Sequence, residues 1–196
     1  MKQYNTIEAF VLAGGKSIRM GSDKGLTLLK GRPMISYILE TLQKAELPVR
    51  IIANDNAYEV FGSKVHSDII SGKGPMGGLL TAFEHTAADI VLLAGCDMPL
   101  VPVEVVKWLL GHADTEKIVA PVPEGHINPL FALYPCSFKQ KLKENISSGR
   151  LKMAGFVLEN KHVLIPFPGK DRPWCFQNVN DPLQIRELEA GWDSFK

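Results

Sequence analysis

The sequence has 196 residues, of which 45% are hydrophobic and 22% are charged, and this ordinary globular composition predicts one domain spanning residues 1–196. Its net charge of +1 argues against nucleic acid as a partner, because nucleic-acid-binding proteins usually carry a clear basic excess. Three widely spaced cysteines without a C-x-x-C pair argue against a disulfide framework or a structural zinc site, and the lack of a signal peptide or a membrane-length apolar run predicts a cytoplasmic protein with no membrane partner.

Apolar periodicity and the positions of glycine and proline divide the chain into alternating strands and helices. In chain order, the predicted elements are a strand at 7–13, a loop at 14–24, a short extended piece at 26–29, a helix opened by Pro33, strands at 49–53 and 65–68, a helix opened by Pro75, a strand at 89–94, a helix at 102–110, strands at 118–122 and 129–134, helices at 137–146 and 150–158, strands at 163–167 and 175–179, and a helix at 181–190. Asp181 is the predicted N-cap of the last helix, with Pro182 at its first position and Gln184 where a capping box places a glutamine.

The alternation of strands and helices over about the first 120 residues predicts an α/β fold, with a mostly parallel central sheet and helices on both of its faces. In an open parallel sheet, ligands bind at the carboxyl ends of the strands. Polar or charged groups follow each of the first four predicted strands: the glycine loop after the first, Asn54 after the second, Asp68 after the third and Asp97 after the fourth. We therefore expect these groups to lie at one edge of the sheet.

The loop at 14–24 begins with two glycines and contains the cations Lys16, Arg19 and Lys24. Adjacent glycines let backbone N–H groups approach an anion closely, and the cations add charge-assisted donors. The loop matches neither the Walker A pattern nor G-x-G-x-x-G, so it predicts a phosphate-binding loop of another kind. The alternative is a solvated turn with surface cations, and the pair of Asp23 and Lys24 at the end of the loop favours phosphate binding.

Asp97 follows the buried strand at 89–94, where an unpaired carboxylate would lose its hydration. Because Mg²⁺ prefers carboxylate and phosphate oxygens, Asp97 is predicted to hold Mg²⁺ together with a triphosphate. The alternative is a turn or helix-capping aspartate, although the next predicted helix begins slightly too far along the chain for a direct cap. The neighbouring Cys96 is predicted to be a packing residue, since the aspartate beside it would raise the pKa of its thiol.

Two further segments carry polar groups suited to a ligand. In the glycine-rich segment 67–79, Asp68 is suited to accept from a ribose hydroxyl or a base edge, and the helix opened by Pro75 would present its first amides to the ligand. The alternative for this segment is a flexible connection. Asn178 and Asn180 alternate along an extended segment and therefore share a face, where they would hold a ligand or a metal-bound water, or simply end a strand.

The motif L-A-G-G-K-S-I-R-M-G-S-D-K at 12–24 resembles the signature loop of the nucleotidyltransferases that activate sugar phosphates and related compounds. Four later motifs make the chain similar to one branch, the molybdenum cofactor guanylyltransferases of the MobA family: G-P-M-G-G-L at 74–79, C-D-M-P at 96–99, N-P-L-F-A-L-Y at 128–134 and F-Q-N-V-N-D-P at 176–182. This resemblance covers nearly the whole chain. It implies a three-layer Rossmann-like nucleotidyltransferase fold and the transfer of GMP from GTP to the terminal phosphate of molybdopterin, which forms molybdopterin guanine dinucleotide and releases pyrophosphate.

The resemblance also implies roles for individual residues. Asp97 would bind Mg²⁺, Lys24 and Arg19 would contact the phosphates, and these three residues would carry the catalysis. The remaining residues that the resemblance places around the nucleotide are Leu12, Ala13, Gly14, Gly15, Asn54 and Asp68. Asn178 and Asn180 would lie on the side of the pterin acceptor. The implied partners are GTP and molybdopterin, with transient contacts to molybdenum-insertion proteins and molybdoenzymes.

Two departures from the family pattern bear on these expectations. Asp181 stands where the family often has threonine, which matters little because aspartate also caps a helix. S-G-K precedes G-P-M-G-G-L in a stretch that varies between branches of the family. The resemblance therefore implies the choice of nucleotide less directly than it implies the type of reaction. The alternatives are a CTP-dependent cytidylyltransferase acting on the same pterin, a transferase acting on a sugar or alcohol phosphate, a regulatory protein that binds GTP without turnover, and a partner-docking protein that uses the lysine-rich helix 138–144.

Overall fold

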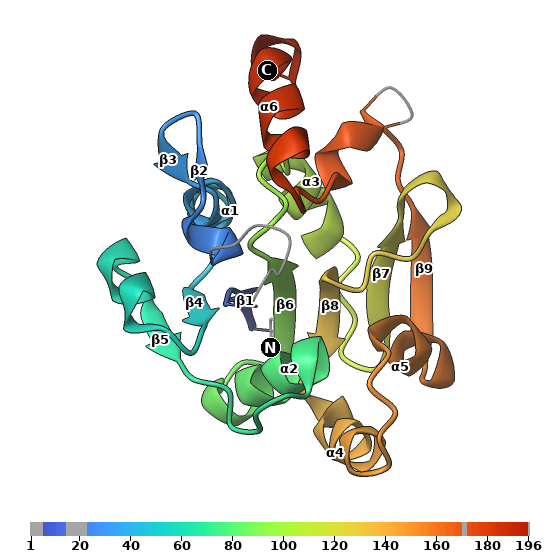
Figure 1. Cartoon of the computed structure of the whole chain (residues 1–196). Coiled ribbons are helices and arrows are strands. Elements are labelled where there is room, and N and C mark those ends of the chain that lie inside the picture. Colours follow the sequence, from blue (N-terminus) through green and yellow to red (C-terminus); the bar gives the residue numbers. More distant parts are fainter. Residues whose placement is uncertain (1–5, 15–22, 170–171, 196) are drawn as a thin grey trace.

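The computed structural model describes residues 6–14, 23–169 and 172–195, and its centre is a seven-stranded β-sheet (Figure 1). Along the sheet, the strands follow the order β5 (Lys64–His66), β4 (Val49–Ile52), β1 (Ile7–Leu12), β6 (Ile90–Gly95), β8 (Phe131–Pro135), β7 (Ile118–Val122) and β9 (His162–Pro166). Neighbouring strands are parallel, except that β8 runs antiparallel to both β6 and β7. The predicted α/β fold with a mostly parallel sheet is therefore confirmed.

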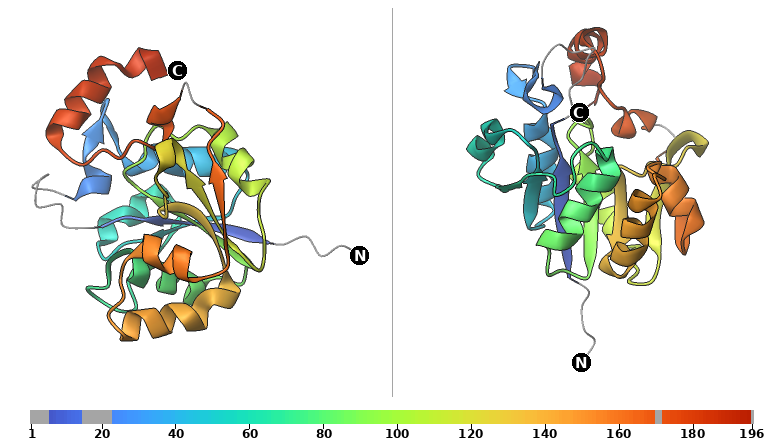
Figure 2. Two further views of the ribbon diagram at one scale, coloured as in Figure 1. Left: turned by 90° about the vertical axis from the view of Figure 1, so that its right-hand side faces the viewer. Right: turned by 60° about the horizontal axis from the view of Figure 1, so that its bottom comes forward.

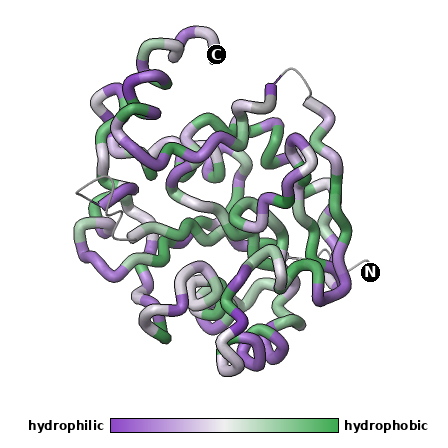
Figure 3. The backbone as a smooth tube through the Cα atoms, turned by 45° about the vertical axis from the view of Figure 1, so that its right-hand side comes forward, coloured by the Kyte–Doolittle hydropathy of each residue, from purple (hydrophilic) through white to green (hydrophobic). Residues whose placement is uncertain are grey.

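Helices cover both faces of the sheet (Figure 1). Helices α1 (Ile35–Lys44) and α3 (Val103–Leu110) pack on one face, and α2 (Gly74–His85), α4 (Lys139–Ser147) and α5 (Met153–Glu159) pack on the other. All six residues of β6 are buried, as expected for a strand with both faces covered. In Figure 3 the hydrophobic segments accordingly lie mainly in the interior and the hydrophilic ones mainly outside.

The carboxyl-terminal part of the described chain packs against a short hairpin made by β2 (Leu28–Leu29) and β3 (Arg32–Pro33) (Figure 2). Helix α6 (Pro182–Ala190) begins at its predicted N-cap, and Oδ1 of Asp181 accepts from the amides of Leu183 and Gln184, both at 2.9 Å. The helix and the hairpin share a small apolar cluster of Leu29, Met34, Leu100, Val179, Ile185 and Leu188. The end of the chain is thus joined to the residues that follow the glycine loop.

Three predicted elements differ in the structure. The strand predicted at 175–179 is wrong, because Pro173–Phe176 forms a 3₁₀ turn and Val179 then donates its amide to the Asp97 carbonyl (2.9 Å) rather than to a neighbouring strand. Pro33 does not open a helix but lies in β3, and α1 begins at Ile35. The helix predicted at 150–158 begins only at Met153. Among the described residues, no helix is both long enough and apolar enough to cross a lipid bilayer.

Candidate active site

The carboxyl ends of β1, β4 and β6 meet at one edge of the sheet, and hydrogen bonds connect the residues there. The amide of Ala13 donates to the Ile52 carbonyl (2.9 Å), and the amide of Cys96 donates to the Leu12 carbonyl (3.0 Å). Gly14 then turns the chain with a φ of 81°, in the left-handed region that glycine adopts without steric cost. These contacts hold three strand ends around one space.

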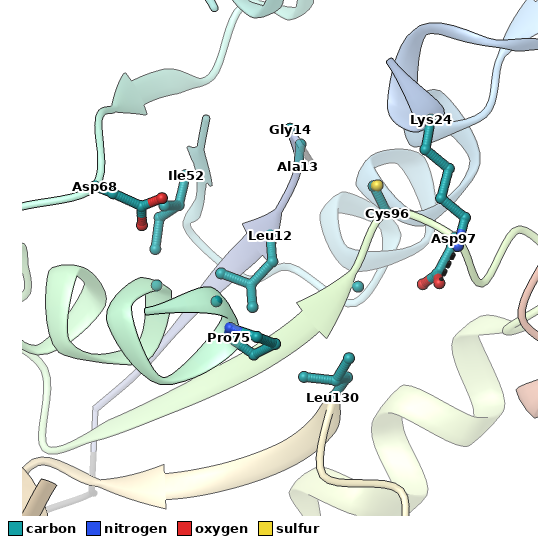
Figure 4. Close-up of a pocket in the computed structure, with 13 residues that line it drawn as sticks. Leu12, Ala13, Gly14, Lys24, Ile52, Asp68, Pro75, Cys96, Asp97 and Leu130 are labelled. Atoms are coloured by element: carbon teal, nitrogen blue, oxygen red, sulfur yellow. Dashed lines mark hydrogen bonds and ion pairs between the residues drawn. The ribbon is translucent and has the colours of Figure 1, made fainter. Parts of the chain in front are cut away.

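A cavity of about 230 Å³ opens at this edge (Figure 4). Six of the residues expected to bind the nucleotide line it: Leu12, Ala13, Gly14, Lys24, Asp68 and Asp97. The other lining residues are Ile52, Gly74, Pro75, Gly78, Gly95, Cys96 and Leu130. Gly15 and Arg19, also expected at this site, lie outside the described residues. Of the groups expected after the four strands, Gly14, Asp68 and Asp97 line the cavity, whereas Asn54 does not and Ile52 lines it at the end of β4.

Four residues that line the cavity were not singled out from the sequence. The place of each one in the fold explains why it lies there. Ile52 and Gly95 are the last residues of β4 and β6, as Leu12 is of β1, so the same argument from strand ends would have found them. Gly78 lies in α2, where a Cβ would approach Cδ2 of Leu12 to 2.5 Å, so glycine allows the helix to pack closely on the end of β1. Leu130 belongs to the N-P-L-F-A-L-Y motif, and its carbonyl accepts from the amide of Gly95 (2.9 Å).

Asp68 lies on one side of the cavity, across the end of β1 from Lys24 and Asp97 (Figure 4). Two hydrogen bonds join it to Asn54: Nδ2 of Asn54 donates to Oδ2 of Asp68 (3.1 Å), and the amide of Asp68 donates to Oδ1 of Asn54 (2.9 Å). Asn54 thereby orients the Asp68 carboxylate. The structure thus brings together two of the residues that the resemblance places around the nucleotide.

On the opposite side, Lys24 joins two distant residues. Its Nζ donates to Oδ2 of Asp97 (2.7 Å) and to Oδ1 of Asn180 (2.5 Å). The side chains of Lys24 and Asp97 are only 15% and 14% exposed, so water screens their attraction less than it would at the surface. Three residues expected in the site therefore meet, although Asn180 is 156 residues from Lys24 in the chain.

Backbone contacts hold Asn180 beside this ion pair. The preceding residue, Val179, is buried and donates its amide to the carbonyl of Asp97 (2.9 Å). The amide of Asn180 donates to Oε1 of Gln184 (2.6 Å), so the predicted capping glutamine reaches one residue beyond the cap. Asn178, on the other side of Val179, is exposed. The burial of Val179 between two more exposed asparagines agrees with an extended segment, although this segment does not form a strand.

Cys96 lines the cavity but its surroundings suppress its reactivity. Burial and, after it, the Asp97 carboxylate raise the pKa of the Cys96 thiol above its usual range. The residue is 6% exposed and belongs to the core cluster on the α1 face of the sheet. These properties agree with a packing role and oppose a role as nucleophile.

A divalent cation at this site would find the carboxylate of Asp97. The described residues contain no group of three or more His, Cys, Asp and Glu side chains that would hold a metal by themselves. Mg²⁺ often takes one or two protein carboxylates and completes its shell with phosphate oxygens and water, so this donor set fits an ion that binds together with a nucleotide. Because Nζ of Lys24 occupies Oδ2 of Asp97, an ion that binds this oxygen would have to displace it.

A family model described as a MobA-like NTP transferase domain matches residues 9–162. The chain belongs to this family. The molybdenum cofactor guanylyltransferase of Shewanella pealeana is 35% identical over 188 residues, with 93% of each chain covered, and that of Haemophilus influenzae is 34% identical over 181 residues, with 89% of this chain and 93% of the other covered. Molybdopterin-guanine dinucleotide biosynthesis protein A from Archaeoglobus fulgidus has the same fold, with a TM-score of 0.80, 23% identity, and 95% of this chain and 99% of that one covered. The MobA-like family and the nucleotidyltransferase fold expected from the motifs are confirmed.

Proposed function

We propose that this chain is a molybdenum cofactor guanylyltransferase, which transfers GMP from GTP to the terminal phosphate of molybdopterin and releases pyrophosphate. The arrangement of charges across the cavity carries the proposal. A carboxylate oriented by an amide, Asp68 with Asn54, lies on one side, and the Lys24–Asp97 pair lies on the other. The name shared by relatives that match 93% of the chain supports GTP and a pterin as substrates.

The two sides of the cavity suit the two ends of a nucleotide. Asp68 accepts from a ribose hydroxyl or from an N–H of guanine, whose 2-amino group is a donor that adenine lacks. Gly74 and Pro75 line the cavity at the beginning of α2, so the positive end of the helix dipole lies at the cavity, where it would attract phosphates. Lys24 completes the phosphate side with a full positive charge.

The reaction depends on positioning and on charge neutralisation. An oxygen of the acceptor phosphate attacks the α-phosphorus of GTP and forms the new P–O bond, while the bond to the bridging oxygen of the β-phosphate breaks and pyrophosphate leaves in line. The acceptor phosphate is already anionic, so no side chain has to remove a proton from it. Lys24 offsets negative charge on the transferred and leaving phosphates, and we assign the same role to Arg19.

Lys24 also protects the metal-binding carboxylate before the nucleotide binds. In the present arrangement it neutralises Asp97 at 2.7 Å, so the carboxylate does not lie unpaired in a poorly hydrated site. The phosphates of GTP offer Lys24 another anionic partner, and its movement toward them exposes Oδ2 of Asp97. Asp97 would then hold Mg²⁺, which when bound supplies further neutralisation of the phosphate charge. Asn180 loses its contact with Lys24 in the same movement and, with Asn178, becomes available to the acceptor.

Nucleotide specificity is tested by thermal unfolding with GTP, CTP, ATP and UTP, each in the presence of Mg²⁺. A ligand that binds only the folded state raises the unfolding temperature, so we expect the largest increase with GTP. Stabilisation by CTP but not by GTP would contradict the guanylyltransferase assignment. Pyrophosphate release from GTP is then measured with molybdopterin, with sugar phosphates and without an acceptor. Binding of GTP without any release would instead indicate a regulatory GTP-binding protein.

The assignment of Asp97 is tested by Asp97→Ala, for which we expect a loss of turnover on the order of 10²–10³-fold or more with the fold retained. Lys24→Ala is expected to lose much of the activity, because it removes one contact to the phosphates. Asp114→Ala, which removes a carboxylate paired with Lys117 at 3.6 Å, is the matched control and should leave turnover unchanged. Near-normal turnover of the Asp97 variant in Mg²⁺ would refute its role at the metal.

The proposal also includes three predictions from the sequence that concern the cellular setting. These are a single domain over residues 1–196, a cytoplasmic location, and transient contacts with molybdenum-insertion proteins and with the molybdoenzymes that receive the finished cofactor. The expected contacts follow from the proposed reaction, whose product is useful only when an apoenzyme takes it up, whereas the single domain and the location are predictions from the sequence.

A further inference from the structure

A buried tyrosine lies beside the active site and has no part in the chemistry proposed above. Tyr58 belongs to the 3₁₀ segment Asn56–Phe61, which begins two residues after Asn54, and its side chain is 0% exposed. The ring packs in the core on the α1 face of the sheet, with the ring of Phe61 at 6.1 Å. A phenol hydroxyl in such a place needs a hydrogen-bond partner, because it has no water to donate to.

The partner of this hydroxyl is Asp23, the residue directly before Lys24. The hydroxyl of Tyr58 donates to Oδ1 of Asp23, and the same oxygen accepts from the amide of Gly25 at 3.0 Å. One carboxylate oxygen of Asp23 therefore binds two donors. These are the backbone amide of Gly25, which follows Lys24, and the Tyr58 hydroxyl, which comes from the core. Burial and, after it, the hydrogen bond to Asp23 raise the pKa of Tyr58 above its usual range, so the hydroxyl remains a donor at neutral pH.

Gly25 shows how closely the backbone beyond Lys24 approaches the tyrosine. A Cβ at Gly25 would lie 2.5 Å from the hydroxyl oxygen of Tyr58, and 3.1 and 3.2 Å from two of its ring carbons. A larger residue at position 25 would therefore displace the ring or the backbone. The tyrosine and the glycine fit each other, and the chain at residues 23–25 rests directly on the tyrosine hydroxyl.

Lys24 lies between the two anchored residues and extends away from them toward Asp97 and Asn180. A lysine side chain has four rotatable bonds, so the position of its ammonium group is defined only when its backbone is fixed. We infer that Tyr58 is a positioning residue of the transfer reaction, which acts through Asp23 and Gly25 to fix the backbone from which Lys24 reaches the phosphates. This inference rests on the proposed role of Lys24.

Tyr58→Phe removes the hydroxyl and leaves the ring. We expect kcat/KM for GMP transfer to fall about tenfold, as for other small misplacements of a catalytic group. Asp23→Ala should show a similar loss, whereas Asp23→Asn keeps an acceptor oxygen and should restore most of the activity. Tyr134→Phe is the matched control: its hydroxyl is equally buried and donates to the Pro129 carbonyl (2.7 Å), so it should lower the unfolding temperature similarly without lowering turnover.

The decisive comparison is made in a Lys24→Ala background by single-turnover measurement. If Tyr58 acts through Lys24, Tyr58→Phe costs no further activity there. A full tenfold loss in that background, or undiminished turnover of Tyr58→Phe alone, would overturn the inference while leaving the proposed function intact. Unchanged turnover of Lys24→Ala itself would overturn both the inference and the role proposed for Lys24, whereas absence of GMP transfer by the unmodified protein would overturn the proposed function. If Tyr58→Phe does not fold, Asp23→Ala and Asp23→Asn carry the same comparison in the two backgrounds.

Discussion

A single methyl group at Gly95 would test whether the position of the Asp97 carboxylate determines turnover. Gly95 is the last residue of β6, and a Cβ there would lie 2.5 Å from Oδ1 of Asp97. Ordinary contacts of a Cβ begin at 3.4 Å, so in Gly95→Ala the carboxylate oxygen has to move by about 0.9 Å, the difference between the two distances. The charge and the identity of residue 97 stay unchanged.

This displacement is large for catalysis and small for stability. A misplacement of about 1 Å costs on the order of 10²-fold in rate, which corresponds to ~2.7 kcal/mol of activation free energy. Turning one side chain away from its preferred rotamer costs only ~0.5–1.5 kcal/mol, or a few degrees in unfolding temperature for a chain of this size. We therefore expect Gly95→Ala to fold and to bind GTP but to turn over about a hundredfold more slowly.

The measurement is pyrophosphate release at saturating GTP and Mg²⁺, with thermal unfolding of the same preparations. Gly155→Ala in α5 is the matched control, because the nearest atom to its added Cβ is the Cβ of Lys152 at 3.7 Å. In that helix interior alanine should stabilise the protein by roughly 0.5–1 kcal/mol and leave turnover unchanged. A wild-type rate for Gly95→Ala would show that the placement of Asp97 is not critical, and the reasoning that assigns it to the metal would fail.

Three other predictions concern stability and nucleotide binding. Burial, then the neighbouring His85 and Arg50, lower the pKa of His66 from 6.5 to about 4, so between these pH values the unfolded chain binds more protons than the folded protein. The free energy of unfolding should therefore fall by at most about 3 kcal/mol as the pH drops from 6.5 to 4. In denaturant titrations, His66→Gln should show a shallower dependence of this free energy on pH. Asp181→Ala removes the acceptor for two α6 amides and should cost about 1 kcal/mol in chemical denaturation, whereas Asp181→Ser should retain most of the cap. Asn54→Ala releases the Asp68 carboxylate and should raise the KM for GTP several-fold with kcat nearly unchanged, so an unchanged KM would contradict the assignment of this pair to the nucleoside.

The part of the site that could be predicted from the sequence follows from local patterns and one rule of topology. Short apolar runs identified β1, β4 and β6, and the carboxyl ends of neighbouring parallel strands necessarily meet at one edge. That rule places Gly14, Asp68 and Asp97 around one cavity before any side-chain contact is known. Residues beyond the described part of the chain, Gly15 and Arg19, remain predictions.

The contacts that could not be predicted join residues far apart in the chain. An aromatic residue such as Tyr58 indicates burial, but nothing local to it indicates that its hydroxyl meets Asp23, 35 residues away. The mistaken strand at 175–179 has the same cause. Val179 is buried as a strand residue would be, but its amide binds the carbonyl of Asp97, and this pairing depends on the packing of α6 rather than on local pattern.

The 156-residue separation of Lys24 and Asn180 has a consequence for the order of events on the ribosome. Translation delivers the amino-terminal half first, at about 5–20 residues per second, so β1, β4, β5 and β6 are available for pairing several seconds before Asn180 is made. A nascent chain at that stage has the strand ends that surround the nucleotide, with Lys24 and Asp97 but without the segment that closes on them. Assembly of the complete catalytic arrangement is therefore a late event in the synthesis of this enzyme, and arrested chains that end before residue 179 should capture nucleotide without completing the acceptor side.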